Sequence, residues 1–173
     1  MRILLCAAAL AAASLWPALA AADDCGDAAA LLRQAYPKIQ KSADGRSFTL
    51  EPHTSIPLAV PQDGMPGLVC KVWPAHDDLL LVAVPLIDSV QSADGQHVGD
   101  IELLVVDRKS LGVRQRLLQP GLMTDDAIAI RKVEFDTGRY RLAPDVSAFG
   151  LPIQLATHSQ VTPFDETGRR PQS

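Results

Sequence analysis

The sequence lacks an excess of basic residues: 16 Lys and Arg stand against 20 Asp and Glu, and the formal net charge is −4. A nucleic-acid-binding protein needs a positively charged face that neutralises phosphates, so this balance argues against that class. Aromatic residues make up only 5% of the chain, which leaves few for a surface on which sugars or bases could stack. The phosphate-binding patterns GxGxxG and GxxxxGKS/T do not occur, so nucleotide-dependent enzymes of those classes are unsupported.

The usual patterns of catalytic and metal-binding residues are missing as well. No GxSxG motif surrounds a serine, and no histidines have the HExxH spacing of zinc enzymes. We therefore expect no catalytic residue, no metal ligand and no cofactor. One alternative stays open, a secreted hydrolase, because one compact cluster of titratable residues is present at His76, Asp77 and Asp78.

The N-terminus has the pattern of a cleaved secretory signal. Arg2 gives a short positive region, residues 3–19 form an apolar run, and Ala18-Leu19-Ala20 supplies the small residues of a cleavage site. The run is short for a membrane span, and Asp23 and Asp24 follow it. The sequence thus predicts a signal peptide over residues 1–20, export to the periplasm or the medium, and no stable membrane span after cleavage.

Two cysteines, Cys25 and Cys70, remain outside this predicted signal, whereas Cys6 lies within it. Exported proteins meet an oxidising environment, where an even pair of cysteines usually forms a disulfide. Their spacing does not fit the CxxC motif of redox or metal sites. The sequence predicts a structural Cys25–Cys70 disulfide, worth about 4 kcal/mol if it is unstrained.

A helix is predicted over residues 24–36, approximately. Asp23 or Asp24 is a suitable N-cap, and Pro37 disfavours continuation beyond Tyr36. Cys25 would then lie in the first turn and fasten the helix to a strand that carries Cys70. The apolar residues that recur at helical spacing are Ala28, Leu31, Leu32, Ala35 and Ile39.

The rest of the chain, to about residue 155, predicts short strands separated by turns. The 101–106 run is apolar almost throughout, which is typical of a central strand covered on both faces. Residues 53–66 are expected to form a loop, and a bulge near Arg131–Lys132 would reconcile two phases of apolar residues. Further strands are expected at 46–51, 68–73, 79–84 (ended by Pro85), 113–118, around Tyr140 and Leu142 after a turn at 136–138, and at 149–155.

These elements favour a mainly β fold, a small antiparallel β-sandwich or partly open barrel with one N-terminal helix. With 173 residues, of which 47% are hydrophobic, the chain suits one domain. We expect this domain to span residues 21–162 and to be followed by a polar, disordered tail over residues 163–173.

The C-terminal half resembles uncharacterised exported bacterial proteins rich in β-structure. The resemblance rests on the segments Leu103–Asp107, Thr137–Pro144 and Ala148–Gly150, roughly a third of the chain, and includes no catalytic motif. As the resemblance implies, such proteins continue past the equivalent of Thr162-Pro163-Phe164 into one more apolar strand, which is absent here.

The predicted role is an exported, non-catalytic binding or protein-interaction module. Phe149 and Leu151 belong to the predicted strand 149–155, which Pro152 marks as an edge strand or a bulge. Arg139 and Arg141 would face outward from a neighbouring strand. An envelope protein that adds a strand at this edge is the expected partner. An inhibitor of a periplasmic enzyme is a further alternative.

Overall fold

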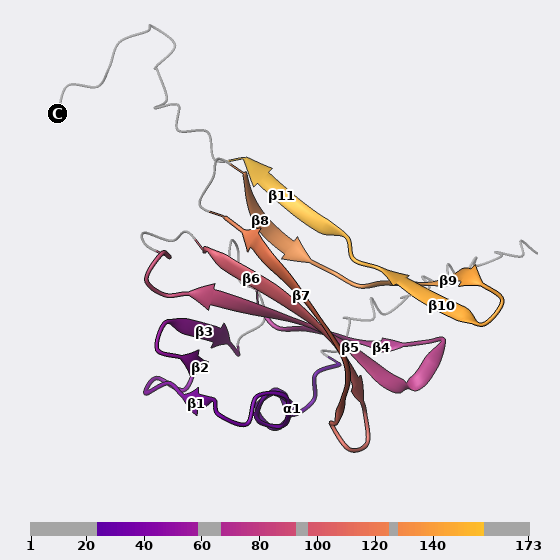
Figure 1. Ribbon diagram of the computed structural model, residues 1–173, viewed down its shortest axis with the longest axis horizontal. Helices are drawn as coiled ribbons and strands as arrows, with labels where there is room; N and C mark the ends of the chain where they lie inside the picture. Colours follow the sequence, from indigo (N-terminus) through magenta and orange to yellow (C-terminus); the bar gives the residue numbers. More distant parts are fainter. Residues whose placement is uncertain (1–23, 59–66, 93–96, 125–127, 158–173) are drawn as a thin grey trace, which may run out of the picture.

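A computed structural model describes residues 24–58, 67–92, 97–124 and 128–157. The predicted signal peptide and the predicted tail lie outside these residues. Within them, one helix precedes a series of antiparallel strands (Figure 1), which confirms the mainly β fold. The elements are α1 (Ala28–Ala35), β1 (Gln40–Lys41), β2 (Ser47–Glu51), β3 (Thr54–Pro57), β4 (Val69–Trp73), β5 (His76–Asp88), β6 (Gly99–Asp107), β7 (Val113–Met123), β8 (Ile128–Val133), β9 (Asp136–Ala143), β10 (Val146–Gly150) and β11 (Ile153–Thr157).

Helix α1 begins later than predicted. Its N-cap is Asp27, whose carboxylate accepts a hydrogen bond of 2.9 Å from the backbone N–H of Ala30. The prediction of Asp24 as the cap was wrong because the Asp24 carboxylate instead accepts a bond from the backbone N–H of Val72. The other candidate, Asp23, lies outside the described residues. Cys25 consequently precedes the helix and does not lie in its first turn.

The strands β5 and β6 form the centre of a seven-stranded sheet, in which six strands follow the order β1-β2-β3-β5-β6-β7 and the seventh, β4, pairs with β5. The other edge of β5 is shared, because β3 pairs with its C-terminal end and β4 with its N-terminal part. The prediction that Pro85 ends this strand was wrong. Pro85 lies between the stretches paired with β3 and β4, so its missing N–H interrupts no ladder on that side of β5.

Both faces of the central strands are covered, as predicted for residues 101–106. One face packs against α1, β2 and β3, and includes Leu104 and Val106 of β6. The opposite face includes Ile101, Leu103 and Val105 and packs against residues of β8 and of the β10–β11 segment. The alternation along β6 therefore serves two separate hydrophobic cores, and the sheet is not closed into a barrel.

The second core is covered by a two-stranded ribbon, in which β8 pairs with β11 and β9 pairs with β10 (Figure 1). The predicted bulge is confirmed: Gln154 pairs with Lys132 and Leu155 with Ile130, so Arg131 is the extra residue. The prediction of one strand over 149–155 was wrong. The carbonyl of Pro152 accepts a bond of 3.1 Å from the N–H of Glu134 at the break between β10 and β11.

Other element boundaries also differ from the prediction. Strand β3 lies within the stretch predicted as a loop, and β7 runs five residues past Leu118 to Met123. The turn predicted at Asp136 is instead the start of strand β9. The Asp136 carboxylate accepts hydrogen bonds from the Gly138 N–H (3.0 Å) and the Tyr140 hydroxyl (2.5 Å). No helix in the described part of the chain has the length and apolar composition that crossing a membrane requires.

The turn between β6 and β7 is organised by the carboxylate of Asp107. It accepts hydrogen bonds from the backbone N–H groups of Ser110 (2.9 Å) and Lys109 (3.1 Å), and it forms an ion pair of 2.7 Å with Arg114. The Ser110 N–H and the Arg114 guanidinium hold the pKa of Asp107 well below its usual range.

Replacing Asp107 with Asn should therefore flatten the acid side of the stability profile. Because the folded-state pKa lies below the unfolded value, the carboxylate stabilises the fold above about pH 4, and this contribution is lost as the pH falls. Urea unfolding midpoints measured from neutral pH to pH 2 test the effect. We expect the variant to be less stable at pH 7 and to lose less stability on acidification. If stability fell equally with pH in the variant and the wild type, the Asp107 carboxylate would have the same pKa in the folded and the unfolded chain, which would contradict this expectation.

Candidate interaction surface

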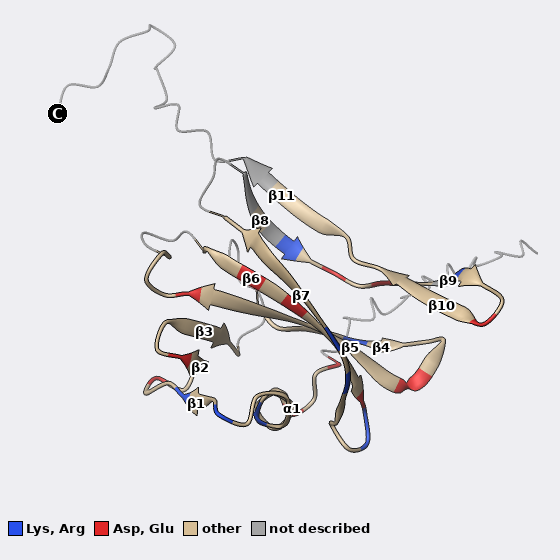
Figure 2. Ribbon diagram, viewed as in Figure 1, with Lys and Arg blue, Asp and Glu red and all other residues tan. Residues whose placement is uncertain are grey.

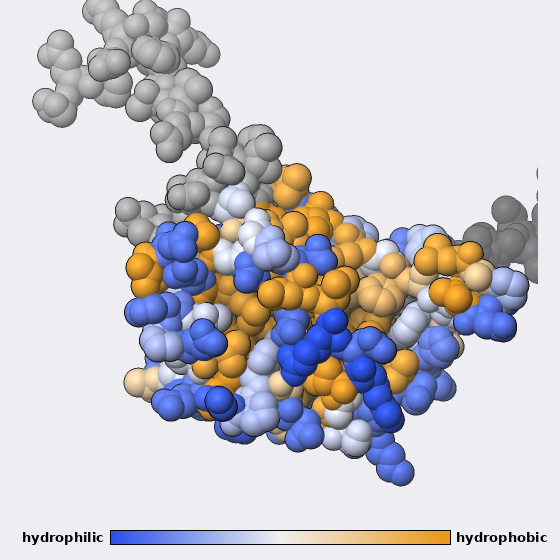
Figure 3. Space-filling view, in the orientation of Figure 1, coloured by the Kyte–Doolittle hydropathy of each residue, from blue (hydrophilic) through white to orange (hydrophobic). Residues whose placement is uncertain are grey.

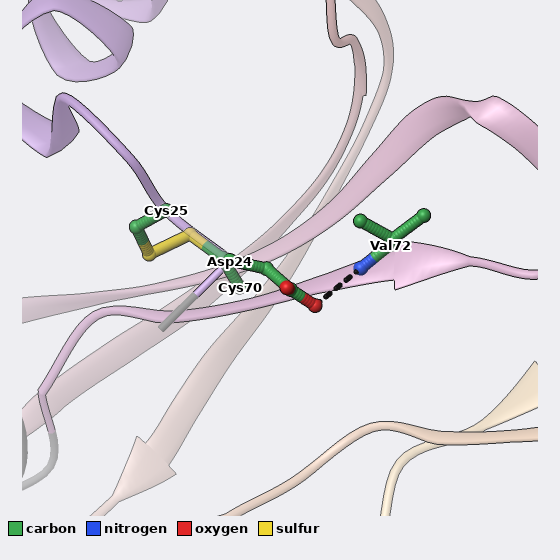
Figure 4. The surroundings of a disulfide bond; sticks show 4 residues. All are labelled: Asp24, Cys25, Cys70 and Val72. Carbon is green, nitrogen blue, oxygen red and sulfur yellow. Dashed lines mark hydrogen bonds between the residues drawn. A yellow bond between two sulfur atoms is a disulfide. The ribbon is translucent and has the colours of Figure 1, made fainter. Parts of the chain in front are cut away.

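The segment before α1 is fixed to strand β4 at two points (Figure 4). Cys25 and Cys70 form the predicted disulfide, with a distance of 5.0 Å between their Cα atoms, and both residues are buried in the first core. Next to it, the carboxylate of Asp24 accepts a bond of 2.9 Å from the Val72 N–H. These contacts set the start of the helix against the sheet.

The C-terminal end of α1 is held by a charged clasp from the sheet. Arg116 of β7 donates to the carbonyl oxygen of Ala35 and forms an ion pair of 3.0 Å with Glu102 of β6. Its guanidinium lies 4.9 Å from the ring centre of Tyr36, whose hydroxyl donates to Glu102. Burial and the neighbouring carboxylate raise the pKa of Tyr36, so its hydroxyl keeps its proton. The cluster fastens the C-terminal end of the helix to the sheet.

The residues of the hydrolase hypothesis lie together at the start of β5 but do not form a catalytic arrangement. His76, Asp77 and Asp78 are exposed, and the His76 ring lies edge-on to Trp73 at 4.6 Å. Arg108 binds the carbonyl oxygens of Asp77 and Asp78, not their carboxylates. No hydrogen bond joins the His76 ring to either acid. In the described ranges, no three His, Cys, Asp or Glu side chains come together in a way that could hold a metal ion.

The four residues predicted to bind a partner do not share one surface. Phe149 and Leu151 are partly buried and pack in the second core, where the Phe149 ring meets Trp73 at 5.4 Å and Phe135 at 5.7 Å. Arg141 is exposed on β9. Arg139 belongs to the same strand, but its side chain lies outside what the structure describes. A charge introduced at Leu151 would therefore disturb the fold, so a Leu151 variant is a poor test of binding.

In the described part of the chain, the hairpin formed by β9 and β10 carries three of the seven large hydrophobic side chains that are exposed. Leu142 is 79% exposed, Val146 48% and Tyr140 47%. The hydrophobic residues gather at the end of this hairpin, which extends from the body of the molecule (Figures 1 and 3). Sequence reasoning missed this surface, because the alternation of Tyr140 and Leu142 resembles the inward face of a strand. The short segment Pro144-Asp145, which marks a hairpin end, was the available signal.

A second surface feature is a cleft of about 440 Å³ between β2, β5 and β6. Three carboxylates line it: Glu51, Asp88 and Asp100. Two of them hold the backbone. The N–H groups of Gln91 and Val90 bind Asp88 and lower its pKa, and the Gly121 N–H donates to Asp100 over 2.7 Å. Among the described residues, the lining of this cleft includes no Lys or Arg, so its charged groups are all acidic. Elsewhere along the strands, acidic and basic residues are interspersed (Figure 2).

Comparison with known proteins gave no match to a protein-family model, to a curated protein or to a solved structure. The resemblance to exported bacterial proteins in the C-terminal half therefore stays a prediction. Among the described residues, Tyr140, Leu142 and Val146 of the β9–β10 hairpin are exposed large hydrophobic residues.

Proposed function

We propose that the chain is an exported, non-catalytic protein-interaction module that binds an envelope protein through its β9–β10 hairpin. The observation that carries this proposal is the exposure of Tyr140, Leu142 and Val146 on one short hairpin. Soluble proteins expose single hydrophobic residues freely, but three on one short projecting hairpin exceed such scattered exposure and favour an interface. Export is supported by the signal-like pattern of residues 1–20 and by the disulfide, a bond characteristic of oxidising compartments.

The hairpin can provide both affinity and specificity. Within the described residues β10 pairs only with β9, so each of the two strands has an outer edge open to a further strand. Backbone hydrogen bonds to a strand added there would give affinity, and the side chains next to it would select the partner. Complete burial of one residue such as Leu142 contributes about 2 kcal/mol.

Replacing Leu142 with Asp should abolish the complex, because a carboxylate would have to be buried in an apolar interface. The measurement is crosslinking of the exported chain in intact cells, followed by mass spectrometry of the crosslinked peptides. A matched control is Val90→Asp, since Val90 is 66% exposed but lies in the turn that follows the C-terminal end of β5. We expect a near-stoichiometric partner crosslinked to residues 140–146, lost in Leu142→Asp and kept in Val90→Asp.

Two results would contradict the proposal. One is a partner that both variants bind equally well, and the other is a folded chain with no partner in the envelope. If the captured partner is an enzyme, its turnover with and without the chain distinguishes an inhibitor from an assembly factor. Activity of the chain alone that is lost in a folded His76→Ala variant would instead support the hydrolase alternative.

A further inference from the structure

Strand β7 ends the seven-stranded sheet, and in the described part of the chain it pairs only with β6. It is 11 residues long, and its middle carries two adjacent exposed leucines, Leu117 (56%) and Leu118 (47%). The register with β6 is unbroken from Gln115 to Gln119, with shifts on both sides. A regular edge with exposed apolar side chains is a template for pairing with another strand, and natural proteins usually cover or blunt it.

The charges of β7 do not blunt this edge. Arg114 forms an ion pair of 2.7 Å with Asp107, and Arg116 forms one of 3.0 Å with Glu102. Arg116 also donates to the Ala35 carbonyl and lies over the Tyr36 ring, so it is committed to the clasp on α1. Both cations are therefore compensated within the same chain, and a second strand approaching the edge meets little unpaired positive charge.

The sequence of this regular stretch is suited to pairing with itself. It reads Gln115-Arg116-Leu117-Leu118-Gln119, which is nearly palindromic about Leu117. In an antiparallel pair of two copies centred on Leu117, leucine faces leucine, each Gln115 faces the other copy's Gln119, and each Arg116 faces the other copy's Leu118. No like charges lie opposite each other.

We propose that the chain forms a symmetric homodimer in which the β7 strands of two copies pair antiparallel about Leu117. The two seven-stranded sheets become one continuous sheet across a twofold axis, and each interface residue meets its own reciprocal partner. This surface is separate from the β9–β10 hairpin, so the dimer leaves the hairpin available.

The register gives a direct test by single-cysteine crosslinking of the full chain, exported, in a Cys6→Ala background. At the twofold axis a Leu117→Cys variant places two cysteines directly opposite, about 5 Å apart between Cβ atoms, from where a small adjustment allows a disulfide. Gln115→Cys on the same face is the matched control, because its two copies lie about 13 Å apart along the strands. We expect a covalent dimer from Leu117→Cys, none from Gln115→Cys alone, and one from the Gln115→Cys/Gln119→Cys double variant.

Sedimentation of the chain without added cysteines provides the second readout. A Leu117→Asp variant should raise the dimer dissociation constant at least about tenfold, while near-UV circular dichroism shows that its fold is intact. Leu142→Asp should leave the dimer unchanged, which separates this interface from the proposed partner surface. A monomer at every concentration, or equal crosslinking of Leu117→Cys and Gln115→Cys, would overturn the proposed pairing.

Discussion

Replacing both Cys25 and Cys70 with alanine is expected to lower the free energy of unfolding by about 4 kcal/mol. The bond joins residues 45 positions apart, and it fixes the segment before α1 to β4. Helix α1 has only eight residues, so it is too short to be stable without its contacts to the sheet. Without the disulfide, the unfolded chain gains freedom, and the start of the helix keeps the Asp24–Val72 bond but loses its covalent link to β4.

Urea unfolding followed by fluorescence and by circular dichroism measures this loss. The wild-type chain unfolded under a reducing agent is the natural control and should approach the double variant. A loss below about 1 kcal/mol would contradict the expectation. It would mean that the Arg116 clasp and the buried side chains of Leu31 and Leu32 hold α1 without help from the disulfide.

The parts of the fold that the sequence predicted are those decided by local patterns. Leu31, Leu32 and Ala35 are buried on one face of α1, because a 3.6-residue period determines which side chains share a face. The alternation of apolar residues changes phase between Ile130 and Val133, which requires one extra residue in the strand. The bulge at Arg131 supplies this residue. The disulfide followed from the predicted compartment and the number of cysteines.

The parts that were predicted wrongly depend on contacts between distant segments. Pro85 is tolerated inside β5 only because β3 and β4 leave that position free, and no local pattern shows how two strands divide an edge. Asp24 is one of the two caps that residue type and position predict, but the Val72 N–H, 48 positions away, donates to its carboxylate. Such pairings depend on the tertiary fold, which overrides local preference.

The candidate site depends on which faces the fold leaves uncovered, and periodicity does not contain this information. Phe149 and Leu142 both belong to alternating apolar patterns. Phe149 lies over the sheet and packs against Trp73, whereas Leu142 lies on the part of the ribbon that extends beyond it. The sequence therefore pointed to this ribbon, but its two apolar candidates, Phe149 and Leu151, pack in the second core. The exposure of Tyr140, Leu142 and Val146 depends on how far the β9–β10 hairpin extends beyond the sheet, and the sequence alone does not show this.

Replacing Gly99 with alanine should destabilise the fold by about 4 kcal/mol, through backbone strain and overpacking together. Gly99 begins β6 and pairs with Ile87 of β5 and Met123 of β7, so strands lie on both sides of it. Its φ of +153° is a conformation that residues with a side chain rarely adopt. A Cβ atom there would lie 2.0 Å from the carbonyl oxygen of Leu86. Because this neighbour is backbone, the central strands themselves would have to separate.

Gly121→Ala is the matched control, because Gly121 also has a positive φ, +61°, but nothing lies within 4 Å of an added Cβ. It should cost about 1–2 kcal/mol, the strain of a left-handed conformation alone. Chemical unfolding of both variants, together with hydrogen exchange of the β5 and β6 amides, measures the difference. Equal losses of stability in the two variants would show that β5 and β6 can move apart near Leu86 without a further loss of free energy. A larger loss for Gly99→Ala, with faster exchange at the Gly99 end of β6, would show that close contact between these two strands holds the centre of the sheet together.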